Sequence, residues 1–507
     1  AQVVLYKHFW GTKNQIDMKK IQCGFVLLKK VKKVGKSCQL VKVSSGPKTL
    51  DKSNKLVRSM IKTVEKGMHL KNKNSCMFCE FNNPDTDHCT WGKMKKKILI
   101  ISDHAQSPSG VGVQTNYLVK GLLKKKDMTF IQLGAAIRHS SYDTVKVCDN
   151  FLIKPVDGFG NKTLLRSVLL NEKPDALIIF SDPRFFEWLF EIEDEIKQVC
   201  PILWWHVWDN EPYPDFNDTL YDATDAINCH SYLTYKLCSK KYPEKTRFIP
   251  HAFPQDEFFR MSIDKIQAEK ERILGEKRKD NFVCLWMNRN CKRKRPADVL
   301  LSWKYFVDML SDVERDRVTL LLHTNPNDKA GQNLIAVAEM LDITDTLALS
   351  TEKLSDELIN TIHNISDVCI NISYNEGFGL TTLQSMQVGN PIIATKTGGL
   401  YRQVVDFEDN TENGVALEPK VKSIAGSQNI PYIYEDYVDC HDVAKAILSL
   451  FEIRPENMSV LSVKVEKYAK KAFDYDTTID LWHESIHDTI QKHNIKKEFG
   501  LEIVDFD

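Results

Sequence analysis

The sequence predicts an α/β protein with two Rossmann-like domains and a small basic N-terminal extension. Its 507 residues are enough for two or three domains that each bury a core of their own. Short apolar runs alternate with helical patterns from residue 95 onward, and this alternation favours parallel sheets. Residues 1–94 lack the alternation, so we expect them to form a separate domain.

Lysine dominates this first segment. About 22 Lys and Arg residues stand against about 6 Asp and Glu residues up to Lys97, although the whole chain has a net charge of +1. Residues 24–43 predict two strands joined by a basic turn. A basic surface suits nucleic acid or an acidic partner, but the aromatic interleaving typical of base stacking is missing. A solvated lysine face is the simpler interpretation.

Cysteines near the end of the segment form one candidate zinc site. Cys76 and Cys79 make a Cys-x2-Cys pair, whose two thiolates can occupy two corners of a tetrahedral site. Cys89 is a candidate third ligand, but its neighbour His88 is badly placed to bind the same ion, so an earlier cysteine would have to help. The alternative is a set of free cysteines in a small basic domain.

The composition also limits where the protein works. No apolar run approaches the roughly eighteen residues of a transmembrane helix, and the start lacks the pattern of a signal peptide. The 13 cysteines are scattered along the chain, which suits a reducing compartment. We therefore expect a soluble, cytoplasmic protein, and peripheral association with a membrane is compatible with this pattern.

The first Rossmann-like domain is predicted over residues 95–262. It opens with a strand over 98–102, a small-residue loop that contains Gly110 and Gly112, and an amphipathic helix to about residue 125. The loop lacks the complete dinucleotide fingerprint, so a purely structural turn is the alternative to a ligand-binding role.

Further strands are predicted in this domain at 176–180 and 201–207, with a helix over 185–199 between them. Ligands of such sheets bind at the carboxyl ends of the parallel strands. His206 falls near one of these ends. A histidine in an aromatic strand is more often a satisfied core residue than a site residue.

The second Rossmann-like domain is predicted over residues 263–474. A strand over 282–287 leads into a basic loop with Arg289 and Lys294, and a helix begins near Pro296. Cations between a strand end and a helix start are placed to neutralise a diphosphate. The alternative is a solvated basic loop, and Arg293 is close enough in sequence to be confused with the first two cations.

The stretch 368–400 is the most informative part of the chain. It reads as a strand, a loop with Glu376, a helix over 380–388 and a second strand. Gly377 and Gly379 let backbone amides approach a ligand, and the helix start favours a phosphate. A carboxylate beside a phosphate must face something neutral and hydroxylated, and a sugar meets that condition.

Residues Glu376 to Thr395, EGFGLTTLQSMQVGNPIIAT, resemble the EGFGLxxxEAMxxGxPVVAT signature of the family 4 retaining glycosyltransferases. The resemblance implies the GT-B fold, in which two Rossmann-like domains face a cleft and a C-terminal helix, here within 475–507, packs back on the first domain. Gln384 replaces the second glutamate of the signature. An amide can still donate and accept hydrogen bonds with a ribose at this position.

The resemblance also implies the roles of site residues towards a nucleotide diphosphate sugar. Arg289 and Lys294 would bind the diphosphate, Gln384 the ribose, and His206 would face the donor sugar. The sugar would also be held by Glu376 and by the backbone of the following loop, and the first glycine loop would lie near the diphosphate and the acceptor. The loop residues concerned are Gly377, Phe378, Gly379 and Leu380, with Gly110 and Gly112 in the first domain.

These observations predict a retaining hexosyltransferase that acts on an acceptor hydroxyl of a glycan, a lipid or another molecule. We expect no metal requirement for transfer, because the cations can do what a divalent ion does elsewhere. Two alternatives stay open. One is a 2-epimerase type of nucleotide-sugar enzyme with the same fold, and the other is a nucleic-acid-associated glucosyltransferase that uses residues 1–94 as its binding module.

Overall fold

The computed structural model describes residues 12–17, 23–28, 38–43, 48, 51–55, 57–59 and 95–496. The chain divides into two compact units, Ala1–Lys93 and Met94–Asp507. In the first unit, β1 (Cys23–Leu28) pairs antiparallel with β2 (Cys38–Val43), which confirms the predicted pair of strands. The candidate zinc ligands Cys76, Cys79 and Cys89 lie outside the described residues, so the zinc site stays a prediction.

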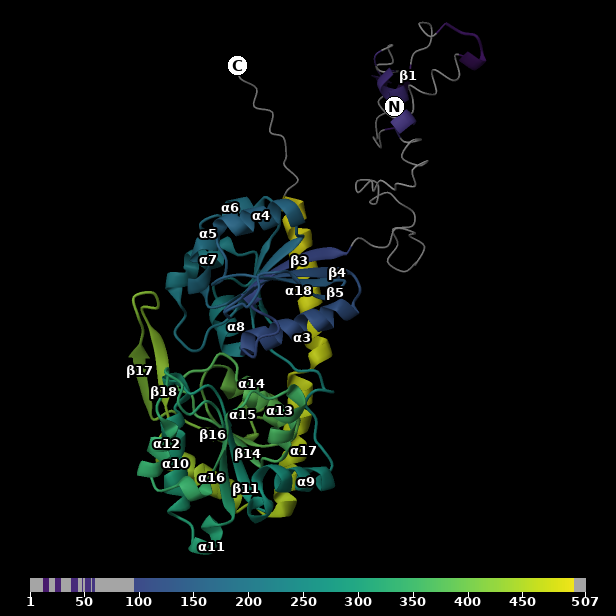
Figure 1. Cartoon of the computed structure of the whole chain (residues 1–507). Coiled ribbons are helices and arrows are strands. Elements are labelled where there is room, and N and C mark those ends of the chain that lie inside the picture. The colour runs from purple at the N-terminus through teal and green to yellow at the C-terminus, as the bar shows by residue number, and fades with distance from the viewer. Residues whose placement is uncertain are drawn as a thin grey trace. The chain divides into compact units, whose positions relative to one another are not determined.

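The second unit begins with an eight-stranded sheet, which with its helices we call the first lobe (Figure 1). Its strand order is β10-β9-β8-β7-β3-β4-β6-β5, and only β5 runs antiparallel to its neighbour. The strands are β3 (Lys96–Asp103), β4 (Met128–Ala135), β5 (Val145–Cys148), β6 (Phe151–Pro155), β7 (Ala176–Ser181), β8 (Ile202–His206), β9 (Ala226–Cys229) and β10 (Thr246–Phe248).

The helices of the first lobe cover both faces of this sheet. They are α3 (Gly110–Lys124), α4 (Lys162–Glu172), α5 (Glu187–Phe190), α6 (Glu193–Lys197), α7 (Asp218–Ala223) and α8 (Tyr232–Ser239). The single helix predicted over 185–199 is wrong, because the chain leaves the helical conformation at Ile192 (φ −121°, ψ 24°). The apolar spacing is nevertheless kept, since Leu189, Ile192 and Ile196 are all buried in the core under the sheet.

A six-stranded, fully parallel sheet forms the second lobe, with the order β13-β12-β11-β14-β15-β16. Its strands are β11 (Phe282–Met287), β12 (Val318–His323), β13 (Leu347–Ser350), β14 (Val368–Asn371), β15 (Ile392–Thr395) and β16 (Gly414–Leu417). Its helices are α9 (Ile263–Leu274), α10 (Pro296–Val307), α11 (Asp312–Arg315), α12 (Leu334–Met340), α13 (Asp356–Asn364), α14 (Leu380–Gln387), α15 (Tyr401–Val404), α16 (Cys440–Phe451) and α17 (Pro455–Ala472). A hairpin of β17 (Val421–Ala425) and β18 (Ile433–Tyr437) projects from this lobe (Figure 1).

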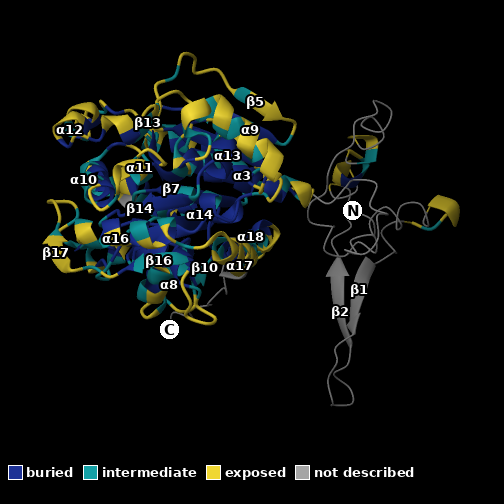
Figure 2. Cartoon of the chain, turned by 90° about the horizontal axis from the view of Figure 1, so that it is seen from below, coloured by how far each residue is buried: buried dark blue, intermediate teal, exposed yellow. Residues whose placement is uncertain are grey.

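Burial follows this layered arrangement. In Figure 2 the buried residues gather around β7, β14, α3 and α14, while α9 lies on the outside and has no buried residue. The apolar strands need this cover, because a parallel sheet buries both of its faces. None of the helices in the described part of the chain is long and apolar enough to span a bilayer.

The last helix, α18 (Tyr475–Lys496), crosses from the second lobe and packs along the first (Figure 1). The Tyr475 hydroxyl donates a hydrogen bond to the Tyr117 carbonyl at 2.7 Å, and Ser485 Oγ donates to Asn228 Oδ1 at 3.0 Å. Trp482 is fully buried, and its ring centroid lies 4.7 Å from that of Trp205 on β8. The helix is therefore part of the core of the first lobe.

Replacing Trp482 by Ala should lower the free energy of unfolding by about 3–5 kcal/mol, the usual cost of removing a buried large aromatic side chain. Urea unfolding of the full chain measures this difference. Val463 on α17 is 64% exposed, so Val463→Ala is the matched control and should change stability by less than about 0.5 kcal/mol. Equal effects of the two substitutions would contradict the packing of α18 described here.

Candidate active site

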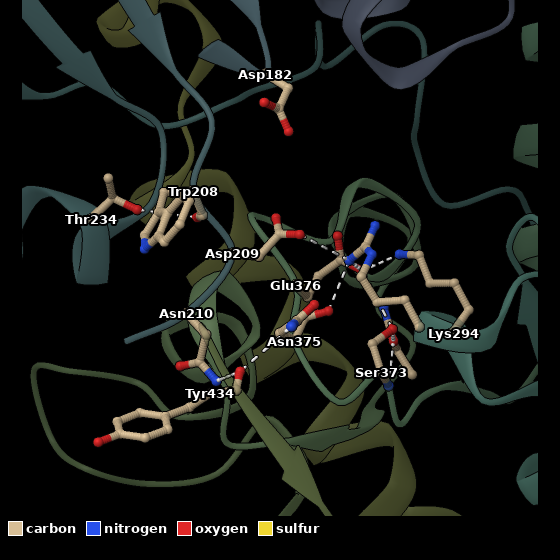
Figure 3. A network of polar contacts seen from close by, with 12 residues as sticks. Asp182, Trp208, Asp209, Asn210, Thr234, Lys294, Ser373, Asn375, Glu376 and Tyr434 are labelled. Atoms are coloured by element: carbon tan, nitrogen blue, oxygen red, sulfur yellow. Dashed lines mark hydrogen bonds and ion pairs between the residues drawn. The ribbon is translucent and has the colours of Figure 1, made fainter. Parts of the chain in front are cut away.

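The candidate site lies where strands of the two lobes end. Asp209 follows β8 of the first lobe, while Lys294 follows β11 and Glu376 follows β14 of the second. Figure 3 shows the side chains of these three residues pointing toward one another, while Asp182, which follows β7 of the first lobe, stands apart from them. This is the edge at which parallel α/β sheets bind their ligands.

Glu376 is the centre of the polar network. Lys294 Nζ contacts Glu376 Oε2 directly, and Arg293 Nη1 lies 3.3 Å from the same oxygen. Ser373 Oγ lies 3.4 Å from it as well. Only 9% of the Glu376 side chain and 12% of the Lys294 side chain are exposed. Two cations thus converge on one buried carboxylate.

The charges of these groups depend on one another. Burial raises the pKa of Glu376, but the charges of Lys294 and Arg293 outweigh burial and lower it to about 2. Burial lowers the pKa of Lys294, and the Glu376 carboxylate opposes that effect. Burial also acts to lower the pKa of Arg293, but Glu376 and Asp209 raise it above its usual value. The site therefore keeps an ionised carboxylate at neutral pH.

Arg293 extends the network to the other lobe. Its Nη1 lies 3.7 Å from Asp209 Oδ2, and it donates a hydrogen bond to the Asn375 carbonyl at 2.8 Å. Burial raises the pKa of Asp209, which Arg293 partly offsets and the charges of Glu376 and Asp182 reinforce. Arg293 thus contacts a carboxyl group from each lobe, Asp209 in the first and Glu376 in the second.

The glycines of the second-lobe loop are required by close packing. A Cβ atom on Gly377 would lie 2.7 Å from Asp209 Oδ1, so a side chain there would displace the Asp209 carboxyl group. Gly379 has φ +92°, in the region that favours glycine. On the neighbouring loop, Gly398 has φ +47°, and its Cβ would lie 2.0 Å from the Glu376 carbonyl oxygen. These glycines fix the loop that presents Glu376.

The first-lobe glycine loop meets the second lobe at the start of α14. A Cβ atom on Gly110 would lie 2.9 Å from Leu380 Cδ1. Ser109 caps α3 by accepting a hydrogen bond from the Gly112 amide at 3.0 Å, and a Cβ on Gly112 would lie 2.5 Å from the His104 carbonyl oxygen. The first turns of α3 and α14, whose amides have no partner within their helices, therefore lie close together.

Two predicted site residues lie apart from the Glu376 network. Arg289 has a side chain that is 69% exposed, and its Nε lies 2.9 Å from Asp328 Oδ2. His206 is fully buried, and its Nε2 lies 2.7 Å from the Tyr221 hydroxyl. The structure thus places Arg293, rather than Arg289, beside Glu376, and the His206 ring in the core of the first lobe.

Phe378 and Gln384 also point away from the network. The Phe378 side chain is buried against His251, with ring centroids 4.9 Å apart, so only its backbone is left for a ligand. Gln384 Oε1 lies 3.4 Å from His363 Nε2, and burial lowers the pKa of His363 to about 3. A neutral imidazole that donates to Gln384 fits this contact.

Sequence reasoning missed the contribution of the β17–β18 hairpin. Asn210 Nδ2 donates hydrogen bonds to Asp436 Oδ2 at 2.7 Å and to the Tyr434 carbonyl at 3.0 Å. The Tyr434 amide in turn donates to the Glu211 carbonyl at 2.7 Å. The hairpin thereby holds the loop after β8. The turn-forming residues Gly426, Ser427 and Asn429, between two short runs that contain β-branched and aromatic residues, were the available signal.

Sequence reasoning also missed a stacked pair of histidines behind the glycine loop. The rings of His230 and His251 lie 4.4 Å apart and nearly parallel, and a Cβ on Gly377 would lie 3.2 Å from His230 Nε2. Burial lowers the pKa of His230 to about 3 and that of His251 below its usual range. Both imidazoles are therefore neutral at physiological pH. Sequence alone gives no sign that these two positions meet.

Comparison with known proteins agrees with this geometry. Residues 267–448, which include Lys294 and Glu376, match the family described as glycosyl transferases group 1. The matched stretch covers most of the second lobe, which is therefore similar to members of this family. This match agrees with the coarser part of the sequence resemblance, a glycosyltransferase with the GT-B fold.

Individual relatives match over a limited span. The D-inositol 3-phosphate glycosyltransferase of Salinispora tropica is 28% identical over 152 residues, which cover 29% of this chain and 30% of that protein. The chain thus matches less than a third of this relative's length.

Solved structures match over a much longer span. The sucrose-phosphate synthase of Thermosynechococcus elongatus has a TM-score of 0.60 and 13% identity, over 78% of this chain and all of that one. HepE from Anabaena, in complex with UDP and glucose, has a TM-score of 0.57 and 14% identity, over 78% of this chain and 99% of that one. These likenesses confirm the GT-B fold of the chain.

Acid should remove the stability that Glu376 contributes, because its folded pKa of about 2 lies below the ordinary value of 4.5. A carboxyl group whose pKa is lowered by folding stabilises the folded state fully at pH values above its ordinary pKa. This stabilisation is lost as the pH falls toward the pKa of the folded state. Wild type should therefore exceed Glu376→Gln in unfolding free energy by about 3 kcal/mol at pH 7. The difference should shrink as the pH falls from 4.5 towards 2.

Urea unfolding across this pH range tests the expectation. Glu418 pairs with Lys396 on the surface and its side chain is 68% exposed, so Glu418→Gln is the control and should cost at most about 1 kcal/mol at any pH. A wild-type advantage over Glu376→Gln that stays constant down to pH 3 would contradict the ionised, paired state of Glu376.

Proposed function

We propose that this protein is a retaining glycosyltransferase that moves a hexose from a nucleotide diphosphate sugar to an acceptor hydroxyl. The observation that carries the proposal is the convergence of Lys294 and Arg293 on buried Glu376 at the edge where the two lobes meet. The family match of the second lobe and the UDP and glucose in HepE support this class of donor.

The leaving group of such a reaction is a nucleoside diphosphate, whose negative charge grows as the bond to the sugar breaks. Lys294 is held in place by Glu376 before any donor binds, so it can stabilise that charge without first being reorganised. The free amides at the start of α14, beside Gly379 and Leu380, add partial positive charge. Catalysis then comes from charge stabilisation and from placing the acceptor, with no divalent ion required.

Glu376 has two tasks in this proposal. Its carboxylate orients Lys294, and it accepts hydrogen bonds from hydroxyls of the donor sugar. Gln384 on the ribose and the loops of Gly110 and Gly112 near the diphosphate complete the proposed donor site. The amide group of Gln384 can both donate and accept hydrogen bonds there.

In this proposal, Arg289 turns toward the diphosphate when the donor binds. Its ion pair with Asp328 is exposed on the Arg289 side, and such pairs are worth about 0–1 kcal/mol, so little opposes its turning toward a bound diphosphate. Arg293 is already beside Glu376. Comparing Arg289→Ala with Arg293→Ala would show which guanidinium lowers kcat when it is lost and which only raises the KM for donor.

The reaction is expected in a reducing compartment. Every cysteine that the structure describes with its side chain is a free thiol, and several of them are buried in the two cores. This is the pattern of an intracellular protein. In this proposal the acceptor side is formed by the first lobe, whose acidic residues Asp182 and Asp209 are labelled in Figure 3.

Replacing Lys294 by Ala should remove about 2–4 kcal/mol of transition-state stabilisation. This loss corresponds to a fall in kcat/KM of roughly 30- to 1,000-fold. Lys292 lies two residues away in the same loop and is exposed, so Lys292→Ala is the matched control and should retain near-normal activity. Thermal melting of both variants excludes unfolding as the cause. Near-normal turnover by a folded Lys294→Ala protein would refute the assigned role.

The donor should be found among nucleotide diphosphate sugars. UDP-, GDP- and ADP-sugars are screened for a rise in melting temperature, because a ligand that binds only the folded state stabilises it. The donor that binds is then incubated with candidate acceptors, and the anomeric configuration of the product is read by NMR. We expect the configuration of the donor to be retained.

Two outcomes of this experiment would overturn the proposal. An inverted anomeric centre would exclude the retaining reaction. Isomerisation of the donor in the absence of any acceptor would instead favour the epimerase type of enzyme.

A further inference from the structure

Two histidines of α18 and an aspartate of the first lobe form a cluster outside the proposed sugar site. His483 and His487 lie one helical turn apart, with ring centroids at 4.5 Å. Both face Asp127, the residue just before β4. His483 Nε2 lies 2.8 Å and His487 Nε2 2.9 Å from Asp127 Oδ2. Three side chains from segments more than 300 residues apart thus converge on one point.

The polar contacts within the cluster are uneven. Both imidazoles share one carboxylate oxygen, while the other oxygen, Asp127 Oδ1, is buried and has no hydrogen-bond partner among the residues that the structure describes. A buried carboxylate oxygen without a partner costs free energy. The nearby ammonium of Lys125 does not supply it, because Lys125 pairs with Asp480 on α18. A cation bound among the three side chains would offset this cost.

We propose that Asp127, His483 and His487 bind one divalent transition-metal ion, with Zn²⁺ the best match for two imidazoles and a carboxylate. The three ligand atoms lie within 4.8 Å of one another. Zinc bonds of about 2.0–2.2 Å place tetrahedral ligand atoms roughly 3.4 Å apart, so small movements of the side chains would admit the ion. The side chains are 27–37% exposed, which leaves the fourth position to water.

The position of the cluster assigns the metal a structural role. Asp127 lies at the amino ends of the first-lobe strands, whereas Glu376 and Lys294 lie beyond the carboxyl ends of the second-lobe strands. The metal therefore takes no part in sugar transfer. It fastens α18 to the start of β4, and so strengthens the return of the chain from the second lobe to the first. The proposal does not depend on the proposed function.

Metal binding is tested on the full chain after removal of metals with a chelator. Adding Zn²⁺ at a hundredfold excess over its dissociation constant should raise the melting temperature by at least about 2 °C. The double variant His483→Gln/His487→Gln should lose this rise. Asp127→Asn keeps the shape of the side chain but loses its charge, and should weaken binding by at least about 10-fold, because even the loss of a residue that only supports a ligand has this effect. Calorimetric titration measures the stoichiometry and the affinity.

The experiment compares the rise in melting temperature that Zn²⁺ causes in each protein. A variant that is less stable than wild type without metal can therefore still be compared. His441 is 62% exposed and lies beside Asp439 on the second lobe, which makes His441→Gln the matched control. It should keep the full response to Zn²⁺. A double variant that binds Zn²⁺ with the same stoichiometry, affinity and thermal response as wild type would overturn the proposal, as would a wild-type chain that binds none.

The cysteines of residues 1–94 could bind a second ion, and Co²⁺ distinguishes the two sites. Thiolate ligands give Co²⁺ an intense charge-transfer absorption in the near ultraviolet, which imidazole and carboxylate ligands do not. The site proposed here should add visible bands without the thiolate absorption, and the double variant should lose only those bands. If all Co²⁺ bound by wild type has the thiolate signature, the ion is bound elsewhere and the proposal is wrong.

Discussion

The contact between Lys294 and Glu376 is the constraint on which the rest of the site depends. Both charges are nearly buried, and a buried charge is tolerated only when it is paired. The loops after β11 and β14 must therefore meet closely enough for the ammonium to reach the carboxylate. The glycines around Glu376 make this approach feasible, because Gly398 leaves no room for a Cβ beside the Glu376 carbonyl.

Arg293 couples this pair to the first lobe, and its two carboxylate contacts are unequal. The contact with Glu376 is the shorter at 3.3 Å, whereas that with Asp209 is 3.7 Å and is more exposed. In the proposed reaction, a bound diphosphate would first replace Asp209, the weaker of these two partners of Arg293. Arg293 would then bind the ligand instead of Asp209. The hydrogen bonds from Asn210 to the hairpin would still hold the loop after β8.

The sequence was most informative where structure is determined locally. The predicted bounds of β11 and the start of α10 at Pro296 match the structure, because an apolar run and an N-terminal proline act within a few residues. It was least informative about which arginine reaches Glu376. That depends on the 3₁₀ turn Lys292–Lys294 and on the left-handed conformation of Arg295 (φ 51°), and neither is evident from a run of basic residues. The contact of Asn210 with Asp436 spans 226 residues, which no local pattern can reveal.

The two C-terminal helices connect the stability of the fold to the geometry of the site. α17 packs against α14 and α18 packs against α3, so one continuous stretch of chain braces the two helices whose first turns meet at Gly110 and Leu380. The fit of α18 is close, since a Cβ on Gly121 of α3 would lie 2.3 Å from Ile479 Cδ1. A contact that holds α18 on the first lobe therefore also limits how far α3 can move from α14. This applies even to a contact at the far edge of the sheet. In this fold the amino ends of α3 and α14 are positioned from behind, by a segment that lies outside the Glu376 network.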